Sequence, residues 1–238
     1  MSETFLDGRV KARQPPVGFR SGTDAVLLAA AVPAETGQTA LELGSGSGAA
    51  SLCLAARVEG VAVTGIELDA DLTTLARENA QTSGLAADFT CADVFALPSE
   101  LKRDFDQVFA NPPFHGDGAA PPDPARARAL MDDGTLQQWL SLGLQRTVSG
   151  GFFTVILRAD RMNEAMAALP RSGVNIFPLW PRIGMAAKRV ILQARKGSRA
   201  PIALLAGMAL HEADGRYTAE AEAILRHGGS LAMESGRL

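Results

Sequence analysis

The stretch at 110–116, ANPPFHG, places an amide side chain, two prolines and an aromatic ring directly after an apolar run. An adenine amino group or an amide nitrogen is a poor nucleophile, because its lone pair is delocalised. The side-chain oxygen of Asn111 and the carbonyl oxygen of Pro112 could each accept a hydrogen bond from one of its two N–H groups while the nitrogen attacks a methyl group. Proline restricts its own φ and extends the preceding residue, so Pro112 and Pro113 would hold these acceptors in place. Phe114 would supply a face on which a flipped base or a planar amide stacks. The motif therefore predicts amino-group methylation, with a simple strand stop as the alternative.

A glycine-rich stretch, LELGSGSG, precedes this motif and places Gly44, Gly46 and Gly48 between an expected strand and an expected helix. It is not a Walker loop, since no Gly-Lys-Ser/Thr follows. It does fit the pattern of dinucleotide-binding turns, in which an acid at the end of the next strand binds the ribose hydroxyls. Glu67 occupies that position. The pattern predicts a nucleotide-like cofactor at this turn.

Two further acids favour S-adenosyl-L-methionine over a dinucleotide. Glu42 stands two residues before Gly44, where it would repel a pyrophosphate but not an ammonium or sulfonium group. Its burial without a cationic partner would be costly. Asp93 follows the third expected strand and could accept a hydrogen bond from an adenine amino group. The sequence therefore predicts S-adenosyl-L-methionine as the cofactor.

The elements that must position these residues alternate along the chain. Nearly continuous apolar runs predict buried parallel strands at 38–44, 61–67, 87–93, 105–111 and 151–157. Helical periodicity predicts helices at 49–58, 69–82 and 135–148, the last with Leu136, Trp139, Leu140 and Leu144 on one face. A further helix at 21–32 is expected to be capped by Ser21, Thr23 or Asp24, and strands at 174–180, 188–194 and 202–210 to extend the sheet. This order predicts an α/β, Rossmann-like fold: a doubly wound, mostly parallel sheet with helices on both faces. Together with the predicted S-adenosyl-L-methionine, it would be a methyltransferase fold.

The bulk properties fit one domain of 238 residues with a net charge of −3. We expect an N-terminal segment and helix at 1–37, a cofactor-binding core at 38–158, and C-terminal strands with a basic segment at 159–238. The Gly-, Pro- and Ala-rich loop at 116–130 is expected to be mobile. Two cysteines outside any CxxC pattern and three scattered histidines predict no metal site. The absence of a long apolar stretch or a signal-like start predicts a cytoplasmic protein without membrane contact.

The positive charges of the chain are unevenly distributed. No acid lies between Glu164 and Glu212, an interval that holds seven cations. Such a run is either solvated surface or an electrostatic footprint for nucleic acid. The footprint interpretation predicts RNA contacts from Arg182, Lys188, Arg189, Arg195 and Lys196.

These motifs resemble a known family. LELGSGSG, GIELD, CADV and NPPF match the Asn/Asp-Pro-Pro-aromatic amino methyltransferases over roughly residues 38–158. The flanking stretches GFRSGTDAVLLAAAV, WPRIGMAAKRVILQARKG and LHEADGRYTAEAEAIL resemble bacterial tRNA adenine N6-methyltransferases that modify the valine tRNA anticodon loop. The resemblance implies a tRNA substrate, methylation of adenine N6, and closure of the cofactor's methionine end by Arg20, Thr23 and Asp24.

Alternatives remain open at this point. His115 after Phe114 is a feature shared with guanine N2-methyltransferases of ribosomal RNA, which usually carry a duplicated preceding domain. Glutamine N5-methyltransferases of release factors carry a helical domain before the glycine turn, where only about forty residues stand here. An NAD-binding oxidoreductase and an inactive RNA-binding module are the rivals from other classes. The tRNA species, the nucleotide position, the oligomeric state and the role of His115 are not indicated by the sequence.

Overall fold

The computed structural model describes residues 2–15, 21–113 and 135–233. The strands are β1 Ser2–Phe5, β2 Val10–Arg13, β3 Thr39–Leu43, β4 Ala62–Glu67, β5 Ala87–Cys91, β6 Phe105–Ala110, β7 Thr147–Arg158, β8 Val174–Trp180, β9 Arg189–Arg195, β10 Ala203–Leu204 and β11 Met208–Ala209. The α-helices are α1 Thr23–Ala31, α2 Ala49–Arg57, α3 Ala70–Ser83, α5 Thr135–Arg146, α6 Met162–Ala168 and α7 Ala219–Leu225. Short 3-10 helices span Val94–Ala96, Ser99–Leu101 and Ala159–Arg161. Phe114 and the expected mobile loop at 116–130 lie outside the described residues.

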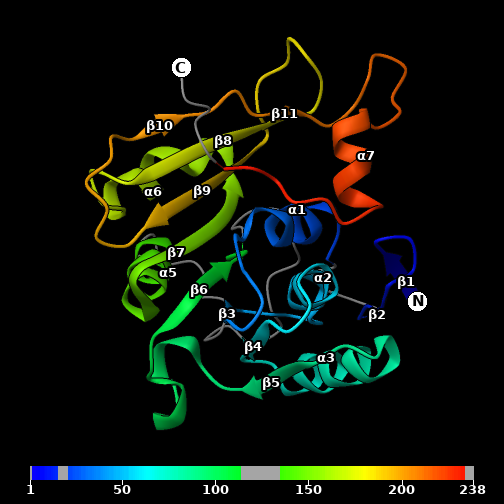
Figure 1. Ribbon diagram of the computed structural model, residues 1–238, viewed down its shortest axis with the longest axis vertical. Helices are drawn as coiled ribbons and strands as arrows, with labels where there is room; N and C mark the ends of the chain where they lie inside the picture. Colours follow the sequence, from blue (N-terminus) through cyan, green and yellow to red (C-terminus); the bar gives the residue numbers. More distant parts are fainter. Residues whose placement is uncertain (1, 16–20, 114–134, 234–238) are drawn as a thin grey trace, which may run out of the picture.

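One sheet forms the centre of the molecule, in the order β5-β4-β3-β6-β7-β9-β8, with β10 and β11 both pairing with β8 (Figure 1). The strands β3 to β7 pair with one another in parallel. β9 runs antiparallel to both β7 and β8. The chain winds outward from β3 to β5 and then crosses to β6 on the other side of β3. This order confirms the predicted doubly wound, mostly parallel sheet; the strand order reverses between β3 and β6, and sheets of this kind bind ligands outside the carboxyl ends at such a point.

Helices cover both faces of the sheet, as predicted (Figure 1). Buried residues of α1, α2, α3 and α7 form one hydrophobic cluster with one face of the strands. Buried residues of α5 and α6 form a second cluster with the other face. Along β6 the neighbours Val108 and Phe109 belong to different clusters. This two-sided burial explains why the strands read as nearly continuous apolar runs.

The expected face of α5 is largely buried. Leu136, Trp139 and Leu140 have exposed fractions of 7% or less, and Leu144 packs partly buried against the same cluster. The helix ends at Arg146, two residues before the predicted end, and β7 begins at the next residue.

The predicted side-chain cap of α1 is wrong. The helix begins after Gly22, and no side chain caps its first turn. Asp24 instead forms an ion pair with Arg189, whose Nε lies 2.7 Å from the Asp24 carboxylate. The acid therefore joins α1 to the start of β9 rather than to its own backbone.

Two other details differ from the sequence-based prediction. Residues 2–13 form an antiparallel hairpin, β1–β2, where only a segment before the helix was expected. The expected strand at 202–210 is two short strands separated by Gly207, which has a φ of 76°. A Cβ on Gly207 would lie 2.2 Å from the Pro178 carbonyl oxygen, so the chain can pass close to β8 only because this residue is glycine.

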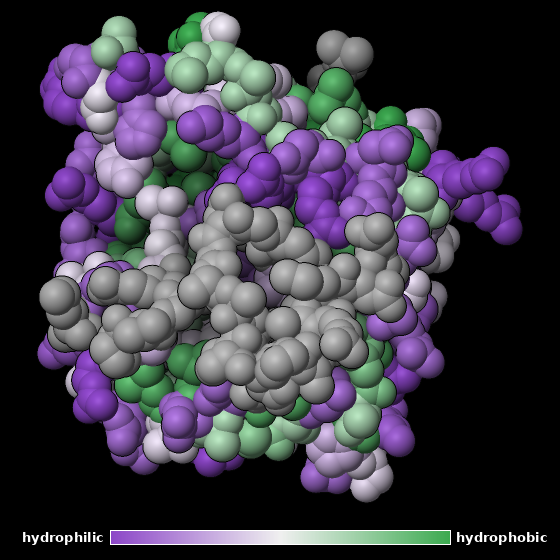
Figure 2. Space-filling view, turned by 180° about the vertical axis from the view of Figure 1, so that it is seen from behind, coloured by the Kyte–Doolittle hydropathy of each residue, from purple (hydrophilic) through white to green (hydrophobic). Residues whose placement is uncertain are grey.

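Seen from behind, hydrophobic residues of the described surface are visible near the top and near the bottom of the molecule (Figure 2).

Candidate active site

The register of the sheet aligns the carboxyl ends of four strands at one edge. Leu43 at the end of β3 lies opposite Ile66 of β4 and Ala110 of β6. Glu67 at the end of β4 lies opposite Cys91 of β5. The glycine turn, Glu67, Asp93 and Asn111 come from these ends or directly follow them, so the fold gathers on one edge the residues that the sequence pattern singled out.

The glycine turn requires glycine at each of its three predicted positions. Gly44, Gly46 and Gly48 have φ values of 69°, 55° and 84°, which L side chains rarely adopt. A Cβ on Gly44 would lie 2.6 Å from the Trp139 ring, and one on Gly48 would lie 2.8 Å from the Phe89 ring. A Cβ on Gly46 would meet no atom within 4 Å. The turn is thus closely packed at its first and last glycines and open beside its middle glycine.

Glu67 stabilises this turn with both oxygens of its carboxylate. Oε2 accepts a hydrogen bond from the backbone N–H of Gly46 at 2.8 Å, and Oε1 accepts one from Asp69 at 2.9 Å. Each carboxylate oxygen can accept more than one hydrogen bond, so ribose hydroxyls could share this acceptor. Its position at the end of β4 fits the predicted cofactor role, which remains a prediction.

Glu42 is buried, with 2% of its surface exposed, and no cationic side chain bonds to it within the described residues. Ser51 of α2 donates to the same carboxyl oxygen from its backbone N–H at 2.9 Å and from its hydroxyl at 2.5 Å. Burial raises the pKa of Glu42 to about 8; the Ser51 hydrogen bonds oppose this rise, and the charge of Glu67 adds to it. Glu42 therefore carries a proton at neutral pH in the free protein, and a cation beside it would favour the charged form.

Asp93 lies on the same edge and also organises the chain locally. Its Oδ1 accepts a hydrogen bond from the backbone N–H of Phe95 at 2.8 Å, which begins a 3-10 helix. Phe95 and Leu68, which follow the two edge acids Asp93 and Glu67 in the chain, are about half exposed, at 47% and 51%. Large apolar side chains left exposed beside a predicted nucleoside site are candidates for contacting a flat ring. The sequence interpretation missed both, although Leu68 is the next residue after Glu67 and Phe95 is the second residue after Asp93.

Asn111 directly follows β6, and its side-chain oxygen is buried. Among the residues that the structure describes, this Oδ1 has no hydrogen-bond partner. A buried acceptor without a partner is uncommon and calls for a functional or structural reason. Pro112 is buried and Pro113 is exposed. Phe114 and His115 lie outside the described residues, as does Arg20.

The remaining predicted cofactor residues lie at the start of α1. Thr23 is exposed, and Asp24 is partly buried in its ion pair with Arg189. Arg189 is the first residue of β9 and lies opposite Arg158, the last residue of β7. Because β7 is parallel to β6, this end of β9 lies at the same edge as Asn111.

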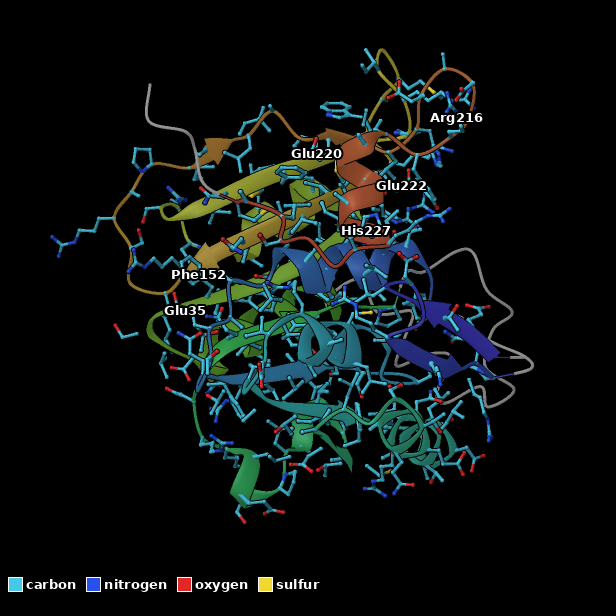
Figure 3. All side chains as sticks on the ribbon, turned by 45° about the vertical axis from the view of Figure 1, so that its right-hand side comes forward. Glu35, Phe152, Arg216, Glu220, Glu222 and His227 are labelled. Atoms are coloured by element: carbon cyan, nitrogen blue, oxygen red, sulfur yellow. The ribbon has the colours of Figure 1, made fainter. Side chains whose placement is uncertain are left out.

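The structure divides the predicted RNA-binding residues between two edges of the sheet. Lys188 and Arg189 lie at the site edge, with Arg182 in the preceding β8–β9 loop. Arg195 and Lys196 lie at the other end of β9, where Arg195 stacks over Phe152 and the Lys196 ammonium donates to the carbonyl oxygens of Gln145 and Thr147. The Arg182 guanidinium lies beside Gly215, the neighbour of Arg216 in the chain, and Figure 3 shows Arg216 far from Phe152, over which Arg195 stacks. The five residues therefore do not form one compact patch.

Two absences apply to the described residues only. They contain no group of three or more histidines, cysteines or acids that could hold a metal ion. No helix among them combines the length and the hydrophobicity that a membrane span requires.

Comparison with known proteins identifies the domain. Residues 20–134 match the methyltransferase small domain. The chain is 36% identical over 158 residues to a tRNA1(Val) (adenine(37)-N6)-methyltransferase of Cronobacter sakazakii, an alignment that covers 63% of each chain. It is 27% identical to the enzyme of that name from Shewanella baltica, covering 84% of this chain and 88% of the other. The crystal structure of a predicted O-methyltransferase from Agrobacterium tumefaciens superposes with a TM-score of 0.72 at 27% identity, covering 87% of this chain and 98% of that one.

The alignment with the Cronobacter relative spans less than two thirds of the length of that protein. The fold, the glycine turn and the aligned domain nevertheless all agree with a methyltransferase. By residues 20–134 the chain belongs to the methyltransferase small domain family, and its fold is that of the S-adenosylmethionine-dependent methyltransferases.

Proposed function

We propose that this protein transfers a methyl group from S-adenosyl-L-methionine to the N6 amino group of an adenine in a tRNA anticodon loop. The observation that carries the proposal is the buried Oδ1 of Asn111, which has no partner in the described part of the chain and lies at the same edge as the glycine turn. The names of the relatives from Cronobacter and Shewanella support tRNA and adenine as the substrate. A cytoplasmic location, where tRNA occurs, is part of the proposal.

The residues at the edge suit a cationic cofactor. The acids Glu42, Glu67 and Asp93 come from the ends of successive parallel strands, whereas a phosphate-binding site would need donors and cations. We infer that Glu67 binds the ribose hydroxyls, Asp93 the adenine amino group, and Glu42, with Thr23, Asp24 and Arg20, the methionine end. The open space above Gly46 leaves room for close approach to the backbone. When bound, S-adenosyl-L-methionine supplies a methyl group on a positively charged sulfur.

Asn111 and Pro112 would prepare the target nitrogen. The Asn111 Oδ1 and the Pro112 carbonyl oxygen would each accept a hydrogen bond from one of its two N–H groups, so that the lone pair of the nitrogen would point at the methyl carbon. The nitrogen would take the methyl group that S-adenosyl-L-methionine would supply, the electron pair of the broken carbon–sulfur bond would stay on sulfur, and the nitrogen would release one proton to solvent. Phe114 would hold the extruded base by stacking. The protein thus contributes orientation and preplaced acceptors rather than a proton-transferring side chain.

The chemistry at Asn111 would also suit a guanine N2 amino group or a glutamine amide, and one experiment separates the three. Purified protein and S-adenosyl-L-methionine are incubated with unmodified tRNA, ribosomal RNA and a release-factor protein. The products are digested and analysed by mass spectrometry. We expect N6-methyladenosine from tRNA alone. N2-methylguanosine or methylglutamine as the product would replace the proposed substrate, and no methylated product would refute methyl transfer itself.

A further inference from the structure

Side chains of α3 hold β2, the second strand of the N-terminal hairpin, against the rest of the domain. Asn79 and Ser83 lie four residues apart and therefore on one face of α3. Asn79 accepts from the backbone N–H of Arg13 at 2.8 Å and donates to the Arg13 carbonyl at 3.0 Å. Ser83 pairs in the same way with Lys11, at 2.9 and 3.2 Å. These bonds fix the course of β2 along the helix, so the residue after β2 has a defined position.

That residue, Gln14, is 4% exposed, and its amide group joins the glycine turn to the start of α1. The side-chain oxygen of Gln14 accepts from the Ser47 hydroxyl and from the Ser21 backbone N–H, each at 3.2 Å. Its side-chain nitrogen donates to the Ser21 carbonyl at 3.3 Å. Ser47 lies between Gly46 and Gly48, and its carbonyl accepts from Asn79 at 2.9 Å. One buried amide thus contacts both segments that are predicted to hold the cofactor.

We propose that Gln14 is a positioning residue for S-adenosyl-L-methionine, acting through Ser47 of the glycine turn and Ser21 before α1. The inference rests on the proposed function, which supplies the identity of the ligand as S-adenosyl-L-methionine. Glycine residues retain the greatest conformational freedom, and a turn built on three of them has few side chains of its own to fix it. Glu67 fixes Gly46 and Asn79 fixes the Ser47 carbonyl, while Gln14 fixes the Ser47 hydroxyl and also the segment that leads to Thr23 and Asp24.

A preorganised turn binds its ligand more tightly, because less freedom is lost on binding. Releasing Ser47 and Ser21 should therefore weaken cofactor affinity while leaving the methyl-transfer step intact once the cofactor is bound. The expected signature is a raised KM for S-adenosyl-L-methionine with a nearly unchanged kcat. A purely structural role would instead lower the stability without this separation.

The test compares Gln14→Met, which keeps most of the volume but loses the hydrogen bonds, with Gln14→Ala and Ser47→Ala. Calorimetric titration with S-adenosyl-L-methionine should give a Kd about tenfold higher for each variant, the equivalent of about 1.4 kcal/mol. The kcat at saturating cofactor should stay within about threefold of the wild type. The double variant Gln14→Ala/Ser47→Ala should be little weaker than either single one, since the two side chains share a hydrogen bond.

Ser83→Ala is the matched control, because it removes the same kind of side-chain bond to β2 without touching Ser47 or Ser21. It should lower the melting temperature and leave the Kd unchanged. A Kd within twofold of the wild type for Gln14→Met, or an equally large loss of cofactor affinity in Ser83→Ala, would overturn this inference but not the proposed function. A wild-type protein that binds no S-adenosyl-L-methionine would refute the proposed function instead.

Discussion

Substitution of Asn111 by alanine should separate activity from stability. Its Oδ1 is a buried acceptor without a partner among the described residues, a state that costs about 1–3 kcal/mol. Asn111→Ala removes this cost but leaves a small cavity, so the net change in the free energy of unfolding should stay within about 1 kcal/mol. For a protein of this size, that corresponds to roughly 2–4 °C in the melting temperature.

The effect on the rate should be much larger. The amide oxygen matters most as the target nitrogen becomes tetrahedral, so its loss should slow methyl transfer about a hundredfold or more, whereas affinities should change less than about tenfold. The assay is single-turnover methyl transfer to tRNA at saturating cofactor and RNA. Thermal unfolding of the same samples gives the stability.

Gln107 offers a matched control in the strand that leads to Asn111. It is also a buried amide, and its Oε1 likewise has no partner within the described chain, but its nitrogen donates to Pro33 and Gln38. Gln107→Ala should therefore lower stability by about 1–2 kcal/mol, with methyl transfer retained in the folded fraction. If Asn111→Ala transfers methyl groups within a few-fold of the wild-type rate, the amine-clamp interpretation is wrong and the motif only ends a strand.

Three further predictions concern charge. Glu67→Ala should weaken S-adenosyl-L-methionine binding by about 1.5–3 kcal/mol in calorimetry, since charge-assisted bonds to the ribose and to Gly46 are lost; an unchanged affinity would remove Glu67 from the site. Between pH 4.5 and about 8 the folded protein keeps a proton on Glu42 that the unfolded chain has lost, so stability falls as the pH rises. Glu42→Gln should flatten this fall in melting temperatures measured from pH 5 to 8, and an unaltered slope would contradict the raised pKa. Lys188→Ala should make the slope of log K for tRNA binding against log salt concentration shallower by about 0.7–0.9, the value of one phosphate contact. Lys196→Ala, at the opposite edge of the sheet, should leave this slope unchanged, and equal effects of the two substitutions would place the RNA elsewhere.

The sequence was sufficient to predict the central fold because its signals are local and strong. Strands buried on both faces are apolar at nearly every position, and α3 and α5 bury residues spaced three and four apart along the chain. The glycines of the turn were predictable for the same reason, since a positive φ favours one residue type. The residues at the carboxyl ends of the strands then follow from the topology alone.

What the sequence did not indicate depends on contacts between distant segments. The β1–β2 hairpin does carry a local signal, alternating polarity around Asp7 and Gly8, but its strands are only four residues long. The bonds of Gln14 to Ser47 and Ser21 leave no pattern in a single sequence. The separation of Lys188 from Lys196 was already implied by the predicted strand at 188–194, whose two ends lie at opposite edges of the sheet; which of these edges carries the site follows from the antiparallel pairing of β9 with β7.

The last described residues complete the packing of the first ones. Arg9 donates to the carbonyl of His227, 218 residues away, and the backbone N–H of Leu231 donates to Ala30 at the end of α1. The segment after α7 starts beside the N-terminal hairpin and crosses α1 toward β8 (Figure 1), where the Met233 carbonyl accepts from Asn175. During synthesis, α1 and the hairpin therefore emerge from the ribosome long before their cover does. Contacts of such large sequence separation slow folding, so the part of α1 that residues 227–231 cover stays uncovered until this segment has been synthesised.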